Sequence, residues 1–158
     1  MDEERFQIWV IEHIGVFHRI ARAFAPGADQ HDLLQELLLS VWRAAPAFRG
    51  DSAPATFIFR VAHNRALTWR RGETRRRRRD TEYQRLHVEE ESGDDPLLDR
   101  LYSAIRQLEP LDRSLVLLSL EGQSYGEIAA LHGLSETNVG ARLTRVRKKL
   151  IQLTEDAP

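Results

Sequence analysis

Apolar residues recur at helical spacing along this chain, and turn residues divide the pattern into short helices. Near the C-terminus, Ser124 and Glu127 have the Ser-x-x-Glu spacing of a capping box, which predicts a helix that begins at Tyr125. Gly133 is expected to end that helix, and Ser135 is expected to cap the next one. The second helix has an apolar stripe at helical spacing: Val139, Leu143, Val146 and Leu150.

Two short helices joined by a tight turn that contains glycine, the second of them basic, are typical of a helix-turn-helix DNA-binding motif. We expect the small side chain of Ala129 to let the two helices cross closely. The side opposite the apolar stripe is predicted to face DNA; the alternative is a solvated basic face on an ordinary helical hairpin. The side chains on this side are Thr137, Ala141, Thr144, Arg145 and Lys148, flanked by Arg142, Arg147 and Lys149.

The N-terminal half of the chain predicts three further helices. The first spans residues 3–24 and is ended by Pro26 and Gly27. The second is capped by Asp29, and the third spans residues 54–71 with Pro54 in its first turn. Apolar residues expected to face the core are Phe6, Trp9, Val10, Ile14, Phe17 and Ile20 on the first helix, Leu33, Leu34, Leu37, Leu38, Val41 and Trp42 on the second, and Ile58, Val61, Ala62 and Trp69 on the third.

Polar side chains mark a second face on two of these helices. On the second helix, the outward side carries Asp32, Gln35 and Glu36. On the third helix, Phe57 lies with polar and basic residues, a combination that suits unpaired nucleic acid, because bases stack on rings and guanidinium groups bind the backbone. The alternative is that Phe57 belongs to the core and that its polar neighbours are merely solvated. Besides Phe57, this face carries the polar residues Arg60, Asn64, Thr68 and Arg71 and the apolar residue Leu67.

Composition narrows the function further. The 158 residues suit one domain or two small helical ones, and the absence of cysteine excludes disulfides and thiolate metal sites. The six histidines have no metal-ligand spacing, and neither a Gly-rich phosphate loop nor a Ser/His/Asp set is present, so no metal, cofactor or catalytic activity is expected. With no membrane-length apolar run and an acidic N-terminus, we expect a cytoplasmic protein without membrane insertion.

Charge is strongly segregated although the formal net charge is −1. Residues 60–79 hold nine arginines and one glutamate, whereas residues 80–100 hold eight acidic residues and two arginines. Such blocks are usually solvated, so residues 74–96 are predicted to be a flexible linker. The five consecutive arginines at residues 75–79 are interpreted either as a disordered tail or as an extension that follows a phosphate backbone.

Two stretches resemble bacterial extracytoplasmic-function (ECF) sigma factors. Their region 2 is similar to DLLQELLLSVWRAAPAFRGDSAPATFIFRVAHNRALTWRR, and their region 4 is similar to LEPLDRSLVLLSLEGQSYGEIAALHGLSETNVGARLTRVRKKL. The resemblance implies an all-α fold of two small helical domains: region 2 at residues 1–73, the linker, region 4 at residues 97–153, and a tail at residues 154–158. It also implies an alternative sigma factor that directs promoter-specific transcription initiation, without chemistry of its own.

The family resemblance also assigns roles to residues. Core RNA polymerase would dock the clamp helices of its largest catalytic subunit on Asp32, Gln35 and Glu36, and the flap of its second-largest subunit on region 4; an anti-sigma factor is a possible further partner. The minus-ten element would be bound and melted by Phe48, Arg49, Asp51, Ser52, Thr56, Phe57, Arg60 and Asn64. The minus-thirty-five element would be read by Ser135, Thr137, Asn138, Ala141, Arg142, Thr144, Arg145 and Lys148.

Three positions depart from the family pattern. Phe57 stands where the family usually has Trp, and Leu38 where Phe is common. Gly140 often corresponds to Lys or Arg; it costs the helix about 1 kcal/mol relative to Ala and removes an expected phosphate contact. Two other functions stay open: a stand-alone helix-turn-helix regulator that binds palindromic DNA as a dimer, and a sigma-like adaptor that binds polymerase without melting DNA.

Overall fold

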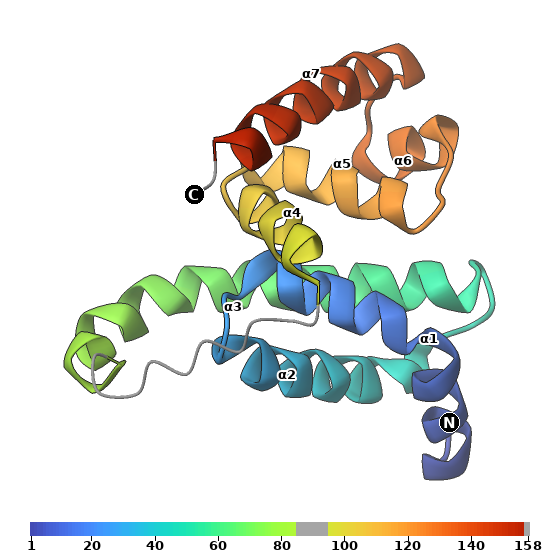
Figure 1. Ribbon diagram of the computed structural model, residues 1–158. Helices are drawn as coiled ribbons and strands as arrows, with labels where there is room; N and C mark the ends of the chain where they lie inside the picture. Colours follow the sequence, from blue (N-terminus) through green and yellow to red (C-terminus); the bar gives the residue numbers. More distant parts are fainter. Residues whose placement is uncertain (85–94, 157–158) are drawn as a thin grey trace. The chain divides into compact units, whose positions relative to one another are not determined.

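The computed structural model describes the backbone of residues 1–84 and 95–156 and the side chains of residues 1–69 and 95–156. Every regular element in these ranges is a helix, and the helices fall into two units, Met1–Glu91 and Ser92–Pro158 (Figure 1). This confirms the predicted all-α fold with two helical domains. None of the described helices is long and apolar enough to cross a membrane.

The first unit is built from three helices that pack against one another in pairs. They are α1 (Glu3–Phe24), α2 (Asp29–Ala44) and α3 (Pro54–Gln84), with a 3-10 turn, η1 (Ala45–Ala47), after α2. Each helix contributes one apolar side to a common core, as the spacing predicts. The fully buried side chains of this core include Phe17, Ile20, Leu33, Leu37, Val41, Ile58, Ala62 and Ala66.

Two residues expected in that core are exposed. Ile14 is 37% exposed, because His13 before it leaves the helical conformation (φ −121°, ψ 17°) and interrupts the rotation of the α1 stripe. Trp42 is 38% exposed, although its ring makes a T-shaped contact with the ring of Phe6 at a centroid distance of 4.9 Å. The predicted inward orientation of both side chains is therefore wrong.

Two helix boundaries also differ from the prediction. Asp29 is the first residue of α2 and not its cap: the cap position is Ala28, which keeps a helical conformation and makes no side-chain hydrogen bond. The turn of Pro26 and Gly27 satisfies the first amides instead, because their carbonyls accept from the amides of Asp29 and Gln30. Helix α3 continues past residue 71 to Gln84, into a stretch rich in Arg and Glu, which are good helix formers. The side chains of residues 75–79 lie outside the described ones.

The second unit contains four helices: α4 (Pro96–Arg106), α5 (Pro110–Leu120), α6 (Tyr125–His132) and α7 (Glu136–Glu155). Asp95 caps α4 by accepting from the amide of Leu97 at 3.0 Å. The core of this unit is mostly apolar; its buried polar residues include Arg113 and Ser114 of α5. The guanidinium of Arg113 donates to the carbonyl of Leu108, in the turn between α4 and α5, at 3.0 Å. The main core side chains are Tyr102, Ile105, Leu108, Leu115, Leu117, Ile128, Val139, Leu143 and Val146.

A polar contact joins α5 to the C-terminal end of α6. The hydroxyl of Ser114, which is buried, lies 2.9 Å from Nε2 of His132 at the end of α6. Burial lowers the pKa of His132, because the partly desolvated imidazole is more stable without its charge.

Candidate nucleic-acid interface

The helix-turn-helix of the second unit has the predicted caps. The Ser124 hydroxyl accepts from the amide of Glu127 at 3.1 Å, and the Glu127 carboxylate accepts from the amide of Ser124 at 3.3 Å, which completes the capping box. Gly133 ends α6 in the left-handed conformation (φ 65°), where glycine is favoured. Ser135 caps α7 through the amide of Asn138 at 3.1 Å. These residues fix both ends of α6 and the start of α7.

The exposed side of α7 is the side opposite its apolar stripe, as the sequence predicted. Val139, Leu143, Val146 and Leu150 are buried, and the opposite residues are exposed: Thr137, Ala141, Thr144, Arg145 and Lys148. The hydroxyl of Thr144 donates to the carbonyl of Gly140 at 2.9 Å, so its polar group is already engaged within the helix.

Arg142 is held against α5 and is only partly exposed. Its Nε donates to Oδ1 of Asn138 at 3.1 Å, and its guanidinium pairs with Asp112 of α5 at 3.5 Å. Beside this pair lies an open cavity of about 290 Å³, lined by Glu109, Asp112, Arg142, Arg145, Val146 and Lys149. The structure therefore brings two of the predicted DNA-contacting residues, Asn138 and Arg142, into contact with each other, and Asp112 is a neighbour that the sequence did not indicate.

Two glycines lie where α6 meets α7. A Cβ atom on Gly140 would lie 3.3 Å from the ring of Tyr125, and one on Gly126 would lie 2.7 Å from the carboxylate of Glu136. Ala129, which was expected to let α6 and α7 cross closely, is buried. An added Cβ atom would also make tight contacts at Gly126 and Gly140, and this was not expected. Sequence reasoning missed this arrangement, and the only signal for it was the presence of glycine inside two helices.

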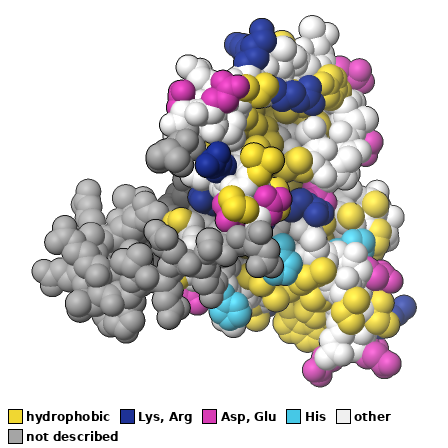
Figure 2. Space-filling model, viewed as in Figure 1, with side chains coloured by type: hydrophobic (Ala, Val, Ile, Leu, Met, Phe, Trp, Pro, Cys, Tyr) yellow, Lys and Arg dark blue, Asp and Glu magenta, His cyan; other side chains and the backbone are white. Residues whose placement is uncertain are grey.

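The polar stripe of α2 lies on the surface of the first unit. Asp32 and Gln35 are exposed, and Nε2 of Gln35 lies 3.2 Å from Nε2 of His31 on the preceding turn. Glu36 forms an ion pair with Arg65 of α3 at 2.9 Å, and 43% of its side chain stays exposed. Exposed hydrophobic side chains also occur on α1 and α2, namely Ile8, Ile11, Ile14, Leu39 and Trp42. Figure 2 shows hydrophobic side chains gathered on this unit in the view that it draws.

An aromatic cluster joins the loop after η1 to α1 and α3. Ring centroids of Phe48 and Phe57 lie 5.1 Å apart, and those of Phe48 and Trp9 also lie 5.1 Å apart. Both phenylalanines are half-buried, so Phe57 is part of a packed cluster with one side at the surface. Around this cluster, Ser52 and Thr56 are half-buried, and the exposed predicted residues are Arg49, Asp51, Arg60 and Asn64.

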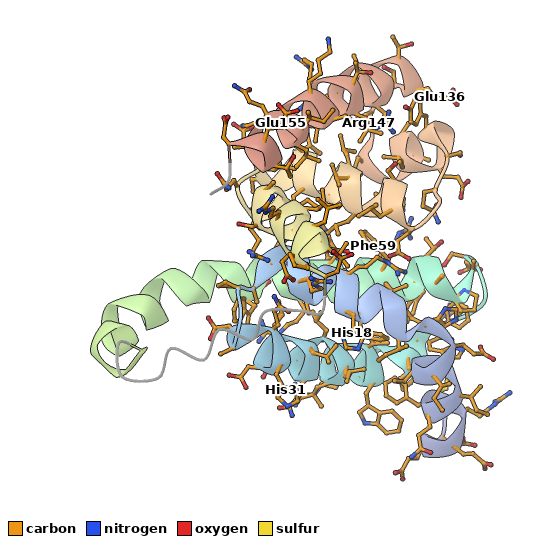
Figure 3. All side chains as sticks on the ribbon, in the orientation of Figure 1. His18, His31, Phe59, Glu136, Arg147 and Glu155 are labelled. Carbon is orange, nitrogen blue, oxygen red and sulfur yellow. The ribbon has the colours of Figure 1, made fainter. Side chains whose placement is uncertain are left out.

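A buried pair of stacked rings on α3 was not predicted from the sequence. Phe59 and His63 are buried, and their rings stack with centroids 5.3 Å apart. The rings of Phe24 and His63 make a T-shaped contact with centroids 5.7 Å apart. The spacing of four residues between Phe59 and His63 is a helical signal that the sequence carried. In the ranges that the structure describes, no group of three or more residues is placed to hold a metal ion. The labelled histidines, His18 on α1 and His31 on α2, are exposed (Figure 3).

Known protein families match both units in chain order. The pattern of Sigma-70 region 2 matches residues 9–76, and that of Sigma-70 region 4 matches residues 98–150. The chain belongs to the sigma-70 family. It is 28% identical to the ECF RNA polymerase sigma-E factor of Escherichia coli strain K12, over 94% of this chain and 86% of that protein. It is 24% identical to the ECF RNA polymerase sigma-E factor of Haemophilus influenzae, over 94% and 87% respectively.

Two solved structures have a similar fold. CnrH, in complex with the cytosolic domain of CnrY, matches with a TM-score of 0.66 and 26% identity, over 99% of this chain and 92% of that chain. The sigma factor RpoE from Bartonella quintana, in complex with the anti-sigma factor NepR, matches with a TM-score of 0.69 and 20% identity, over 98% and 99%. The protein is thus an ECF sigma factor, which directs promoter-specific transcription by RNA polymerase.

Proposed function

We propose that this sigma factor divides promoter recognition between its two units. The first unit docks on core RNA polymerase and opens the minus-ten element, and the second reads the minus-thirty-five element with α7. The observation that carries the proposal is the capped α6–turn–α7 arrangement, whose exposed side presents Arg145 and Lys148 while its apolar stripe is buried. Nucleotide chemistry belongs to the polymerase, and this chain contributes binding and positioning in the cytoplasm.

Docking on polymerase is assigned to the α2 stripe. Asp32 is exposed and Glu36 is partly exposed on α2, and two accessible carboxylates suit a basic partner helix such as a clamp helix of the largest subunit. Arg65 holds Glu36 in place without covering it, because much of the carboxylate side chain remains exposed. The second unit would contact the flap of the second-largest subunit; only the family resemblance supports that contact.

Melting of the minus-ten element is assigned to the loop after η1 and the exposed side of α3. Asn64 and Arg60 are exposed and can donate to base edges and phosphates of an unpaired strand. One side of Phe57 is packed against Phe48, so only its exposed edge would contact a base, and a base would not stack on a fully open ring face. Asn64 and Arg60 are therefore better placed than Phe57 to act on DNA directly.

Reading of the minus-thirty-five element is assigned to the outward side of α7. Arg145 and Lys148 would neutralise phosphates or read bases, and Thr137 and Ala141 would approach base edges. Arg142 would have to give up its contacts with Asn138 and Asp112 in order to reach DNA. The two solved relatives were captured with an anti-sigma factor and with the cytosolic domain of CnrY, which supports regulation of this chain by a partner of that kind.

Transcription with purified core polymerase tests this proposal against its alternatives. The holoenzyme, meaning this sigma factor bound to core polymerase, should initiate at defined promoters, and the Asp32→Ala and Glu36→Ala variants should need more protein to saturate core. Gln7→Ala, an exposed change on α1, is the matched control. A protein that footprints a palindrome alone and never directs initiation would be a stand-alone regulator. One that binds core without opening DNA would be an adaptor.

A further inference from the structure

Helix α5 packs against α7 (Figure 1), and an acidic side chain from its first turn meets the helix assigned to DNA. Oδ1 of Asp112 accepts from the guanidinium of Arg142 at 3.5 Å. Only 24% of the Asp112 side chain and 32% of the Arg142 side chain are exposed. Salt screens a partly buried ion pair less than a pair in open solvent. Asp112 therefore neutralises a cation of α7 in the free protein.

Arg142 is held at a second point by its own helix. Its Nε donates to Oδ1 of Asn138, one turn earlier, at 3.1 Å. An arginine Nε can only donate, so the Asn138 amide must turn its oxygen toward Arg142. The two contacts fix the guanidinium between α5 and the start of α7. A DNA phosphate that approaches Arg142 would therefore have to compete with the Asp112 carboxylate.

The cavity beside this pair holds acidic and basic side chains together. Its lining includes two carboxylates, Glu109 and Asp112, and three cations, Arg142, Arg145 and Lys149. Asp112 is the acid of this cavity that pairs with Arg142. Glu109 occupies the cap position of α5, but its side chain makes no capping hydrogen bond. Glu109 is thus a matched control, because it places the same charge in the same cavity.

We propose that Asp112 is a positioning residue that limits how strongly α7 binds DNA, because it holds Arg142 against α5. The proposal rests on the proposed function of α7. In the free protein, Asp112 pairs with the guanidinium. On a promoter, a backbone phosphate displaces the carboxylate, so each binding event gives up one ion pair. Phosphate contacts carry no sequence information, so this restraint weakens binding to every duplex alike.

Equilibrium binding of the holoenzyme to a duplex that carries its upstream element tests the restraint. Asp112→Asn keeps the size of the side chain and removes its charge. It should raise the binding constant about two- to fivefold, as expected when one partly exposed ion pair no longer has to be broken. The plot of log binding constant against log salt concentration should steepen by about 0.9, the effect of one phosphate contact. A duplex with a scrambled upstream element should show the same relative gain.

A double-mutant cycle with Arg142→Ala shows whether the effect passes through Arg142. In the Arg142→Ala background, Asp112→Asn should give no gain, because no guanidinium is left to release. A gain that persists there, or an equal gain from Glu109→Gln, would show that Asp112 acts only as a general negative charge and would overturn the proposal. Weaker binding by Asp112→Asn would also overturn it, because Asp112 would then support the DNA-binding position of Arg142.

The same cycle measured as unfolding equilibria of the full chain tests the ion pair without DNA. Asp112 and Arg142 should be coupled about two- to fivefold in the folding equilibrium constant, and additive effects would overturn the proposal. The binding experiment also separates the proposal from the function on which it rests. If the natural holoenzyme bound the promoter and scrambled duplexes equally, the proposed reading by α7 would fail, whatever Asp112→Asn did. A clear preference for the promoter duplex, with no gain from Asp112→Asn, would overturn the role of Asp112 alone.

Discussion

Substitution of Asn64 and Phe57 by alanine should separate DNA melting from folding. Phe57 is half-buried and meets two other rings, with centroids at 5.1 Å and 6.1 Å. A fully buried Phe→Ala change costs about 3–5 kcal/mol, so the half-buried ring should cost about 2 kcal/mol in unfolding free energy. Asn64 is exposed within a helix, where alanine should change that free energy by less than about 0.5 kcal/mol.

Open-complex formation by the holoenzyme then isolates the role of Asn64. Loss of one hydrogen bond to an unpaired base, worth about 1.4 kcal/mol, should lower the equilibrium constant for promoter opening about tenfold. Permanganate reactivity of unpaired thymines measures the opening, and titration of core polymerase checks that binding is unchanged. Phe57→Leu keeps most of the apolar volume and serves as the folding control. If Asn64→Ala opened promoters as the natural protein does, the assignment of this face of α3 to melting would be refuted.

Three further outcomes are expected. Ser124→Ala should lower the stability of the second unit by about 1 kcal/mol, because it removes the cap of α6. Circular dichroism should detect this loss and tryptophan fluorescence should not, because all three tryptophans precede residue 92. An equal shift of the unfolding transition in both signals would contradict this prediction. Because burial lowers the pKa of His132, the unfolded chain takes up the proton first, so stability should fall as pH drops below about 6.5, and His132→Gln should flatten that dependence in denaturant titrations. Leu143→Ala, at a buried position of α7, should cost about 2–5 kcal/mol in denaturant titrations and abolish promoter binding, whereas exposed Ile151→Ala should do neither.

Local signals predicted the second unit well, because its helix ends are built from neighbours in sequence. The capping box at Ser124, the left-handed Gly133 and the cap at Ser135 each involve residues within one turn. The buried stripe of α7 followed from helical spacing for the same reason. In the first unit, Asp2 caps α1 by accepting from the amide of Arg5 at 2.8 Å, and this equally local signal was missed.

The remaining differences involve residues far apart in sequence or a departure from ideal helix geometry. Ile14 is exposed because the conformation of His13 breaks the helical rotation, which periodicity assumes to be uniform. The pairing of Arg142 with Asp112 joins residues 30 positions apart, and no spacing rule connects them. Gly140 was understood from the sequence only as a lost contact, whereas the structure shows Tyr125 beside it.

The most direct test of the account is to sequence the 5′ ends of transcripts made from genomic DNA by core polymerase with and without this protein. The account predicts new start sites that appear only with the protein and that share two conserved elements at a fixed separation. Variants at Asn64 should lose transcription from these sites. Variants at Arg145 should change which upstream elements are used. Start sites identical to those of core polymerase alone, or new sites without a shared upstream element, would contradict the two-unit reading of promoters.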